Sequence, residues 1–123
     1  MELRYFQYDE FDSPDMPGSG YGYMDREFLH CLDEARDIAG VKFKILSGYR
    51  SPKENIKKGG LSTSSHLIGR ACDIKCTDTR KRLLIIEGLS MVGFRRFGIG
   101  KDHIHVDSDD LKKPSIWIIS NYI

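Results

Sequence analysis

Polar and apolar residues alternate along residues 103–107, which read HIHVD. This two-residue period is that of a β-strand, in which alternate side chains point to the same face. His103, His105 and Asp107 therefore share one face of a predicted strand. Any fold of this chain must contain a sheet face on which two imidazoles and a carboxylate lie side by side.

A second charged residue lies inside an apolar segment. Residues 71–76 (ACDIKC) predict a buried strand, and Asp73 lies near its middle. A carboxylate in such surroundings is unfavourable unless something compensates its charge, as a zinc ion would. Capping of a neighbouring helix is the alternative role for this Asp. His66 lies in the Ser- and Gly-rich segment 61–70, a predicted loop from which the ring is free to turn inward.

These polar residues fit a metal site. Two imidazoles and one carboxylate are a common ligand set for catalytic zinc. Asp102 precedes the 103–107 strand at a predicted turn, three residues before His105, where its carboxylate could act as a general base towards water. Local chemistry leaves two ligand sets open: His66, Asp73 and His105, or His103, His105 and Asp107.

The other segments alternate between helical and extended patterns. Residues 12–20 are rich in Asp, Ser, Pro and Gly, which predicts a loop over the domain. Pro52 predicts the start of a short helical piece, and Thr77 or Asp78 is suited to cap a helix that ends near Met91. The remaining predicted elements are a weak strand at 3–8, a helix at 25–39, strands at 41–46, 94–99 and 115–119, and a turn at 100–101.

Both long helices carry apolar residues at helical spacing, so each has a face for the core. The predicted core positions are Phe28, Leu29, Leu32, Ala35 and Ile38 in the first helix, and Leu83, Leu84, Ile85 and Leu89 in the second. Together with the strands, this predicts an α+β fold. We expect a single compact domain over residues 1–123, with helices packed on a mostly antiparallel sheet.

Composition narrows the possible functions. The chain has 123 residues and a formal net charge of +1, without the clearly basic face of a nucleic-acid-binding protein. No stretch approaches eighteen consecutive apolar residues, and no apolar secretory signal is visible at the N-terminus. Cys72 and Cys76 could form a zinc pair, but buried free thiols are the favoured interpretation. A monomer is the default expectation.

Three motifs occur in order along the chain. Residues 47–52 read SGYRSP, residues 64–73 fit the pattern S-x-H-x-x-G-x-A-x-D, and residues 102–105 fit a later D/E-x-x-H segment. These motifs resemble the zinc D-Ala-D-Ala carboxypeptidase family over roughly residues 10–107. That family also contains the vancomycin-resistance D,D-dipeptidases, phage endolysins that cut L-Ala-D-Glu bonds and, more distantly, the hedgehog signalling domain.

The resemblance implies a role for each matching residue. Zinc is expected to be held by His66, Asp73 and His105. Asp102 aligns with the catalytic carboxylate of the family. Arg50 aligns with an arginine that binds a substrate carboxylate or polarises the scissile carbonyl, and its planar guanidinium suits both tasks.

Two further roles follow from the same resemblance. Ser64 aligns with a serine that contacts substrate. His103 neighbours the ligand histidine and is expected to stabilise the oxyanion, although many members carry an aromatic residue there.

The implied function is a zinc peptidase that hydrolyses a peptide bond in bacterial peptidoglycan, of D-Ala-D-Ala carboxypeptidase or L-Ala-D-Glu endopeptidase type. Its expected partner is the stem peptide of the wall. Without a secretory signal, such a protein is expected to be made in the cytoplasm, phage-encoded and active at the cell wall as an endolysin. The alternative is a non-catalytic zinc module of the same fold that binds the wall or a partner. A purely structural zinc site needs neither Asp102 nor Arg50, so their presence favours the enzyme.

Overall fold

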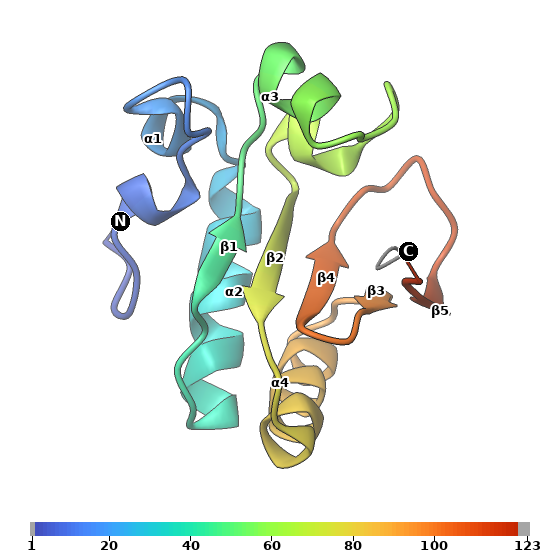
Figure 1. Cartoon of the computed structure of the whole chain (residues 1–123). Coiled ribbons are helices and arrows are strands. Elements are labelled where there is room, and N and C mark those ends of the chain that lie inside the picture. Colours follow the sequence, from blue (N-terminus) through green and yellow to red (C-terminus); the bar gives the residue numbers. More distant parts are fainter. Residues whose placement is uncertain (1, 121–123) are drawn as a thin grey trace.

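The computed structural model describes residues 2–120, and its centre is a five-stranded sheet (Figure 1). The strands lie in the order β1-β2-β4-β3-β5, with β5 parallel to β3 and the other neighbours antiparallel. The predicted α+β fold with a mostly antiparallel sheet is confirmed. The strands are β1 (Ile45–Ser47), β2 (Ala71–Lys75), β3 (Arg96–Ile99), β4 (His103–Asp107) and β5 (Ser115–Ile118).

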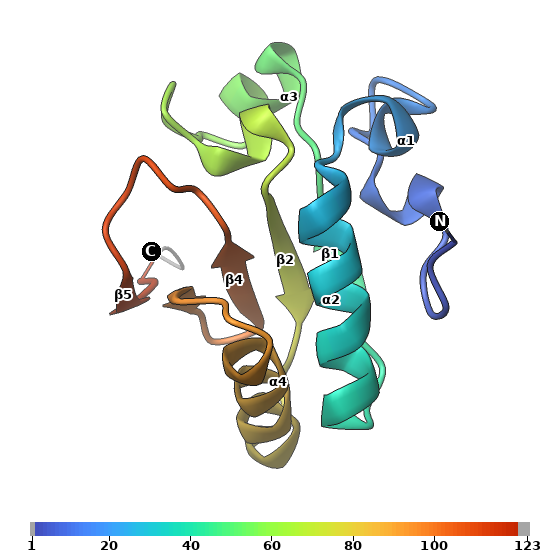
Figure 2. The same ribbon diagram turned by 180° about the vertical axis from the view of Figure 1, so that it is seen from behind.

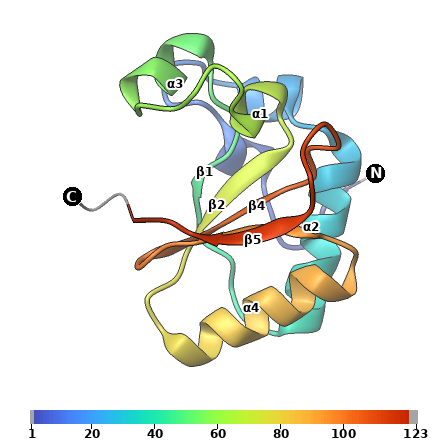
Figure 3. The ribbon, with the colours of Figure 1, turned by 90° about the vertical axis from the view of Figure 1, so that its right-hand side faces the viewer.

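The two long helices cover one face of this sheet (Figures 2 and 3). The shorter helical segments gather near one end of β2, at the top of Figure 1. The helices are α1 (Ser19–Tyr23), α2 (Arg26–Ala39), α3 (Pro52–Lys57) and α4 (Thr79–Met91), with 3-10 turns η1 (Tyr8–Phe11) and η2 (Ser65–Ile68).

The sheet has one apolar and one polar face. Cys72 and Ile74 on β2, with Ile104 and Val106 on β4, are fully buried. Residues between them in the sequence point to the opposite face, because side chains alternate along a strand. The helices therefore close the core on one side, and the other face is free to carry a polar site. The other large, fully buried side chains of the core are Phe11, Phe28, Leu29, Leu32, Phe43, Ile85 and Leu89.

Gly88 allows the two long helices, α2 and α4, to pack closely. A Cβ built on Gly88 of α4 would lie 2.5 Å from the carbonyl oxygen of Ala35 and 3.1 Å from the Cβ of Ala39, both on α2. Only a residue without a side chain permits this approach of the two helices.

Side-chain capping fixes the starts of three helices, and Asp78 is the cap that the sequence predicts for α4. The Asp25 carboxylate accepts a hydrogen bond from the Phe28 N–H at the start of α2, and Asp78 accepts one from the Lys81 N–H at the start of α4. Ser51 caps α3, with Pro52 in the first turn. These contacts satisfy N–H groups that have no partner within the helix.

Two strand predictions differ from the structure, one entirely and one in part. The predicted strand at 3–8 is wrong, because the N–H groups of Arg4 and Tyr5 donate to the Asp33 carboxylate on α2 and not to a neighbouring strand. Of the predicted strand 41–46, only the end pairs with β2, and β1 runs on to Ser47.

Three predicted core positions are also wrong. Ile38, Leu83 and Leu84 are 42%, 59% and 37% exposed. The buried residues of α4 are Ile85, Gly88 and Leu89, because this side of the helix meets α2. A run of adjacent apolar residues cannot lie on one helix face, so part of the Leu83–Ile85 run points away from the core.

Cys31, Cys72 and Cys76 are free thiols, and Cys72 and Cys76 are buried, as favoured from the sequence. Within the described part of the chain, no helix combines the length and the apolar character needed to cross a membrane.

Candidate metal centre

Three potential ligands meet on the polar face of the sheet. Asp73 on β2 and His105 on β4 are directly paired across the two strands. His66 reaches them from η2, just before β2 begins. The ligand atoms of the three side chains all lie within 4.8 Å of one another, and residues 2–120 contain no other such group of three. The structure thus brings together the first of the two sets considered from the sequence.

The His66 ring is held by its outer nitrogen. Its Nδ1 lies 2.7 Å from the carbonyl oxygen of Gly48, and this contact assigns the proton to Nδ1. The Nε2 atom then faces Asp73, 3.4 Å from Oδ1, where it donates to the carboxylate when protonated and is available to a metal when neutral. Ser64 holds the backbone of the same turn, because its Oγ accepts from the His66 N–H. An imidazole held in this way is prepared to donate to a metal.

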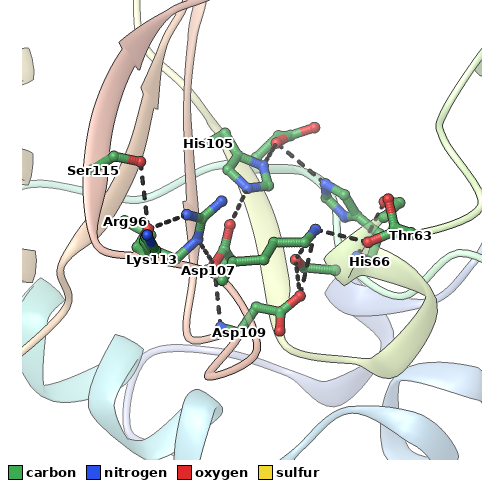
Figure 4. Close-up of polar contacts among 12 residues, drawn as sticks. Thr63, His66, Arg96, His105, Asp107, Asp109, Lys113 and Ser115 are labelled. Carbon is green, nitrogen blue, oxygen red and sulfur yellow. Dashed lines mark hydrogen bonds and ion pairs between the residues drawn. The ribbon is translucent and has the colours of Figure 1, made fainter.

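His105 is held in the same manner from the other side. Its Nε2 lies 2.8 Å from Oδ2 of Asp107, and its Nδ1 lies 3.0 Å from Oδ1 of Asp73 (Figure 4). Asp107 is 1% exposed and also accepts from the Arg96 Nε and the Asp109 N–H. Asp107 therefore contacts the nitrogen of His105 that faces away from Asp73, where it orients the ring instead of joining the group.

Charge explains how the cluster is stabilised. Burial raises the pKa of the Asp73 carboxyl, but hydrogen bonds from His105 and His66 and the charge of both rings outweigh this, so its pKa lies well below the ordinary 3.8. Burial lowers the pKa of His105, and the Asp107 and Asp73 carboxylates more than offset it, so the pKa is raised. The His105 ring therefore lies between two carboxylates, and a cation between this ring and Asp73 would be stabilised by the negative charge of Asp73.

The donor set itself fits zinc. Two imidazole nitrogens and one carboxylate oxygen converge, while Gly48 and Asp107 engage the remaining ring nitrogens. Three protein ligands with orienting partners behind them leave a fourth position for water or substrate, which is the pattern of catalytic zinc.

Arg50 lies at the edge of this group. Its Nη2 lies 3.4 Å from Oδ2 of Asp73, its Nε donates to Ser47 at 3.1 Å, and its Nη1 lies 3.4 Å from the Asn55 side-chain oxygen. The Arg50 side chain is 14% exposed, and these contacts hold its guanidinium in one orientation. It contacts the carboxylate oxygen that faces away from the histidines.

The structure does not bring Asp102 to the triad of His66, Asp73 and His105. Asp102 is exposed in the turn between β3 and β4, and its carbonyl accepts from the Cys76 N–H. It lies three residues from His105, or roughly 10 Å along a strand. Within residues 2–120 its side chain has no hydrogen bond or ion pair with a member of the triad.

His103 lies between these two positions. It pairs with Lys75 and projects from the same face as His105, two residues away. Its ring rests on Gly100, where an added Cβ would lie 2.6 Å from the imidazole Cε1. The side chain is half-buried, so it borders the polar face without touching the triad.

A polar link was not foreseen from the sequence. The Ser65 hydroxyl donates to Oδ2 of Asp109 at 2.7 Å, and the Lys112 ammonium donates to the Thr63 carbonyl at 2.7 Å (Figure 4). These contacts tie the His66 segment to the segment that follows β4. Asp109 and Lys112 form no recognisable motif, and only their proximity to Ser65 reveals them.

Trp117 is a second residue of this region that the sequence does not single out, because it predicts only a short apolar strand there. Its indole centroid lies 5.7 Å from that of His105, and the Arg96 guanidinium lies 4.8 Å above the indole. The signal that could have identified it is Gly98, which leaves the sheet face open at this point, but its meaning depends on β5 pairing with β3.

Comparison with known proteins identifies the family. The model of the family described as Peptidase M15 matches residues 4–107, which is most of the chain and includes the triad and Arg50. No curated protein gives a match. The residues matched are also those that build the polar face of the sheet. The chain belongs to the peptidase M15 family.

Proposed function

We propose that this protein is a zinc-dependent peptidase that hydrolyses a peptide bond in bacterial peptidoglycan, of D-Ala-D-Ala carboxypeptidase or L-Ala-D-Glu endopeptidase type. The observation that carries the proposal is the convergence of His66 Nε2 and His105 Nδ1 on one carboxylate oxygen of Asp73. The peptidase family match over residues 4–107 supports the same conclusion. We expect the protein to act at the cell wall as a phage-encoded lysis enzyme.

In this proposal His66, Asp73 and His105 hold the metal. Bound zinc supplies a Lewis acid that polarises a carbonyl and lowers the pKa of water. Arg50 binds a carboxylate of the stem peptide or the scissile carbonyl oxygen, because its guanidinium is held beside the triad by Ser47 and Asn55.

Proton transfer needs a further group. Asp102 remains the proposed general base, which takes a proton from the attacking water and returns it to the leaving amine. Its exposed position in the turn means that its side chain must reach towards the triad when substrate binds. His103 lies nearer to His105 on the same face and is proposed to stabilise the developing oxyanion.

The second function considered is a non-catalytic zinc module that binds the wall or a partner. The position of Arg50 favours the enzyme, because a zinc site that serves structure alone does not need a guanidinium beside its carboxylate.

Digestion of purified peptidoglycan tests the proposal. The zinc-loaded protein should release muropeptides with new free amino groups, which mass spectrometry of the products will assign to one bond. A chelator should abolish the products, and so should His66→Ala. The matched control is His30→Ala on α2, which should digest normally. Absence of products, or identical products in the presence of chelator, would overturn the zinc peptidase.

A further inference from the structure

We propose that Arg96 and Trp117 are positioning residues of the metal centre: they hold Asp107 against His105 and so set the affinity of the site for zinc. The inference rests on the zinc site of the proposed function. It extends that site to β5, which lies beyond the residues matched by the family.

The first argument is a continuous chain of charged contacts. The Arg96 Nε donates to Oδ1 of Asp107 at 2.7 Å, and Oδ2 of Asp107 lies 2.8 Å from the Nε2 of His105. Both oxygens of one buried carboxylate are therefore used, one by the arginine and one by the ring. The Arg96 side chain also donates to the Lys113 carbonyl, so the guanidinium itself is anchored (Figure 4). Rotation of Asp107 away from His105 would break its contact with Arg96.

The second argument is the place of the indole. Gly98 on β3 pairs with His105 on one side and with Trp117 on the other. A Cβ on Gly98 would lie 2.8 Å from the Nε1 of Trp117, so the indole occupies the space that a side chain at this position would fill. The indole thereby reaches His105 across the glycine, with centroids 5.7 Å apart.

The third argument joins the two. The Arg96 guanidinium lies over the indole at 4.8 Å, which is a favourable cation–π distance. The indole therefore restricts Arg96 from one side, and Asp107 and the Lys113 carbonyl restrict it through hydrogen bonds. The structure describes a clamp in which Trp117 orients Arg96, Arg96 orients Asp107, and Asp107 orients His105.

Zinc affinity tests the clamp directly. The dissociation constant for zinc, measured by competition with a chromophoric chelator, should rise about 10–100-fold in Arg96→Met and Trp117→Ala, the usual effect of removing a partner behind a metal ligand. Trp117→Phe keeps an aromatic ring at the position and should restore most of the affinity. Arg95→Ala and Ile118→Ala alter exposed neighbours and should bind zinc as the unaltered protein does.

A spectroscopic readout is independent of activity. Trp117 is the single tryptophan of the chain, so its fluorescence reports on this site alone. Cobalt, a paramagnetic substitute for zinc, should quench the fluorescence as it binds, and His66→Ala should weaken this quenching. Circular dichroism checks that each variant is folded. Should Trp117→Ala or Arg96→Met fail to fold, Trp117→Phe and Arg96→Lys take their place, with smaller losses of affinity expected.

The outcomes separate the two proposals. If the unaltered protein binds no zinc, the proposed function fails. If it binds zinc and the folded Arg96 and Trp117 variants bind equally tightly, only the clamp is overturned. Cobalt binding that leaves the fluorescence unchanged would also overturn the clamp, because the indole could not then lie beside the metal.

Discussion

At the scale of single residues, the orientation of each imidazole is set by the nitrogen that faces away from the triad. The Gly48 carbonyl engages His66 at Nδ1, and the Asp107 carboxylate engages His105 at Nε2. His66 therefore presents its Nε2 to Asp73, whereas His105 presents its Nδ1 to the same carboxylate. The sequence motifs identify both histidines, but they carry no information on which nitrogen is available.

Arg50 gives the first prediction at this scale. Arg50→Ala should lower kcat/KM about 10–100-fold, the usual effect of losing hydrogen bonds to a charged substrate group. Zinc affinity should not fall, because the guanidinium competes for the Asp73 carboxylate. Steady-state kinetics with a defined muropeptide and a zinc competition assay measure the two effects. Lys53→Ala, an exposed cation on α3, is the control. A large loss of zinc affinity would assign Arg50 to the metal site.

Asp102 gives the second prediction at the scale of single residues. Asp102→Ala should retain zinc and lower kcat about 10²–10⁴-fold, the usual contribution of a general base. Asp102→Asn keeps the size of the side chain and should be equally slow, whereas Lys101→Ala in the same turn should be normal. Single-turnover kinetics on the zinc-loaded variants separate chemistry from binding. Normal turnover in Asp102→Ala, with an inactive His103→Ala, would transfer the base to His103.

At the scale of elements, a loop is tied to the sheet by a polar link. Ser65 on η2 and Lys112 beyond β4 both contact the buried Asp109 carboxylate. Burial raises the pKa of Asp109, but the Ser65 hydrogen bond, the Leu111 N–H and Lys112 outweigh it and lower the pKa below 3.8. The position of His66 therefore depends on a segment more than forty residues away in sequence.

Acid sensitivity tests this link. Because the folded-state pKa of Asp109 is lowered, its stabilising contribution is present above the ordinary pKa and is lost as the pH falls below about 4. Asp109→Asn should lower the free energy of unfolding by about 1 kcal/mol near neutral pH. This difference should shrink as the pH falls through the acid range and Asp109 becomes protonated in the folded state, as measured by urea unfolding of the metal-free protein across pH. The exposed Asp110→Asn is the control, and a pH-independent deficit in Asp109→Asn would argue against an ionised Asp109.

The secondary-structure elements were largely predictable. Strand β4 matches the alternation at residues 103–107, the first long helix lies within the predicted range 25–39, and Asp78 caps α4 as predicted. The clearest failure is the strand predicted at residues 3–8. At residues 3–8 the chain has an alternative partner in Asp33 for its N–H groups, and such a long-range hydrogen bond leaves no local pattern.

At the scale of the whole molecule, the proposed metal site joins segments from across the chain. The proposed ligands come from η2, β2 and β4, so a bound ion would hold together parts that the unfolded chain separates. Such a site does not exist before folding, and the binding free energy therefore adds to the stability of the fold.

Metal removal gives the corresponding prediction. At zinc concentrations about 100 times the dissociation constant, the free energy of unfolding should rise by about 2.7 kcal/mol over the metal-free protein. Thermal unfolding with and without a chelator measures the change in Tm. His66→Ala should show no zinc-dependent shift, whereas His30→Ala should shift as the unaltered protein does. An equal Tm with and without zinc would show that the folded state has no zinc site.

Local pattern was enough to predict the α+β class and most helix and strand positions, and the family resemblance of the motifs predicted the site residues His66, Asp73, His105 and Arg50. These follow from short-range periodicity and motif spacing, which are properties of neighbours in the chain. The tertiary structure decided which carboxylate joins the histidines, because Asp107 lies behind His105 and Asp73 lies in front of it. It also decided that Trp117 lies beside the site. That contact depends on parallel pairing of β5 with β3 across a glycine, an interaction between distant segments that no local pattern specifies.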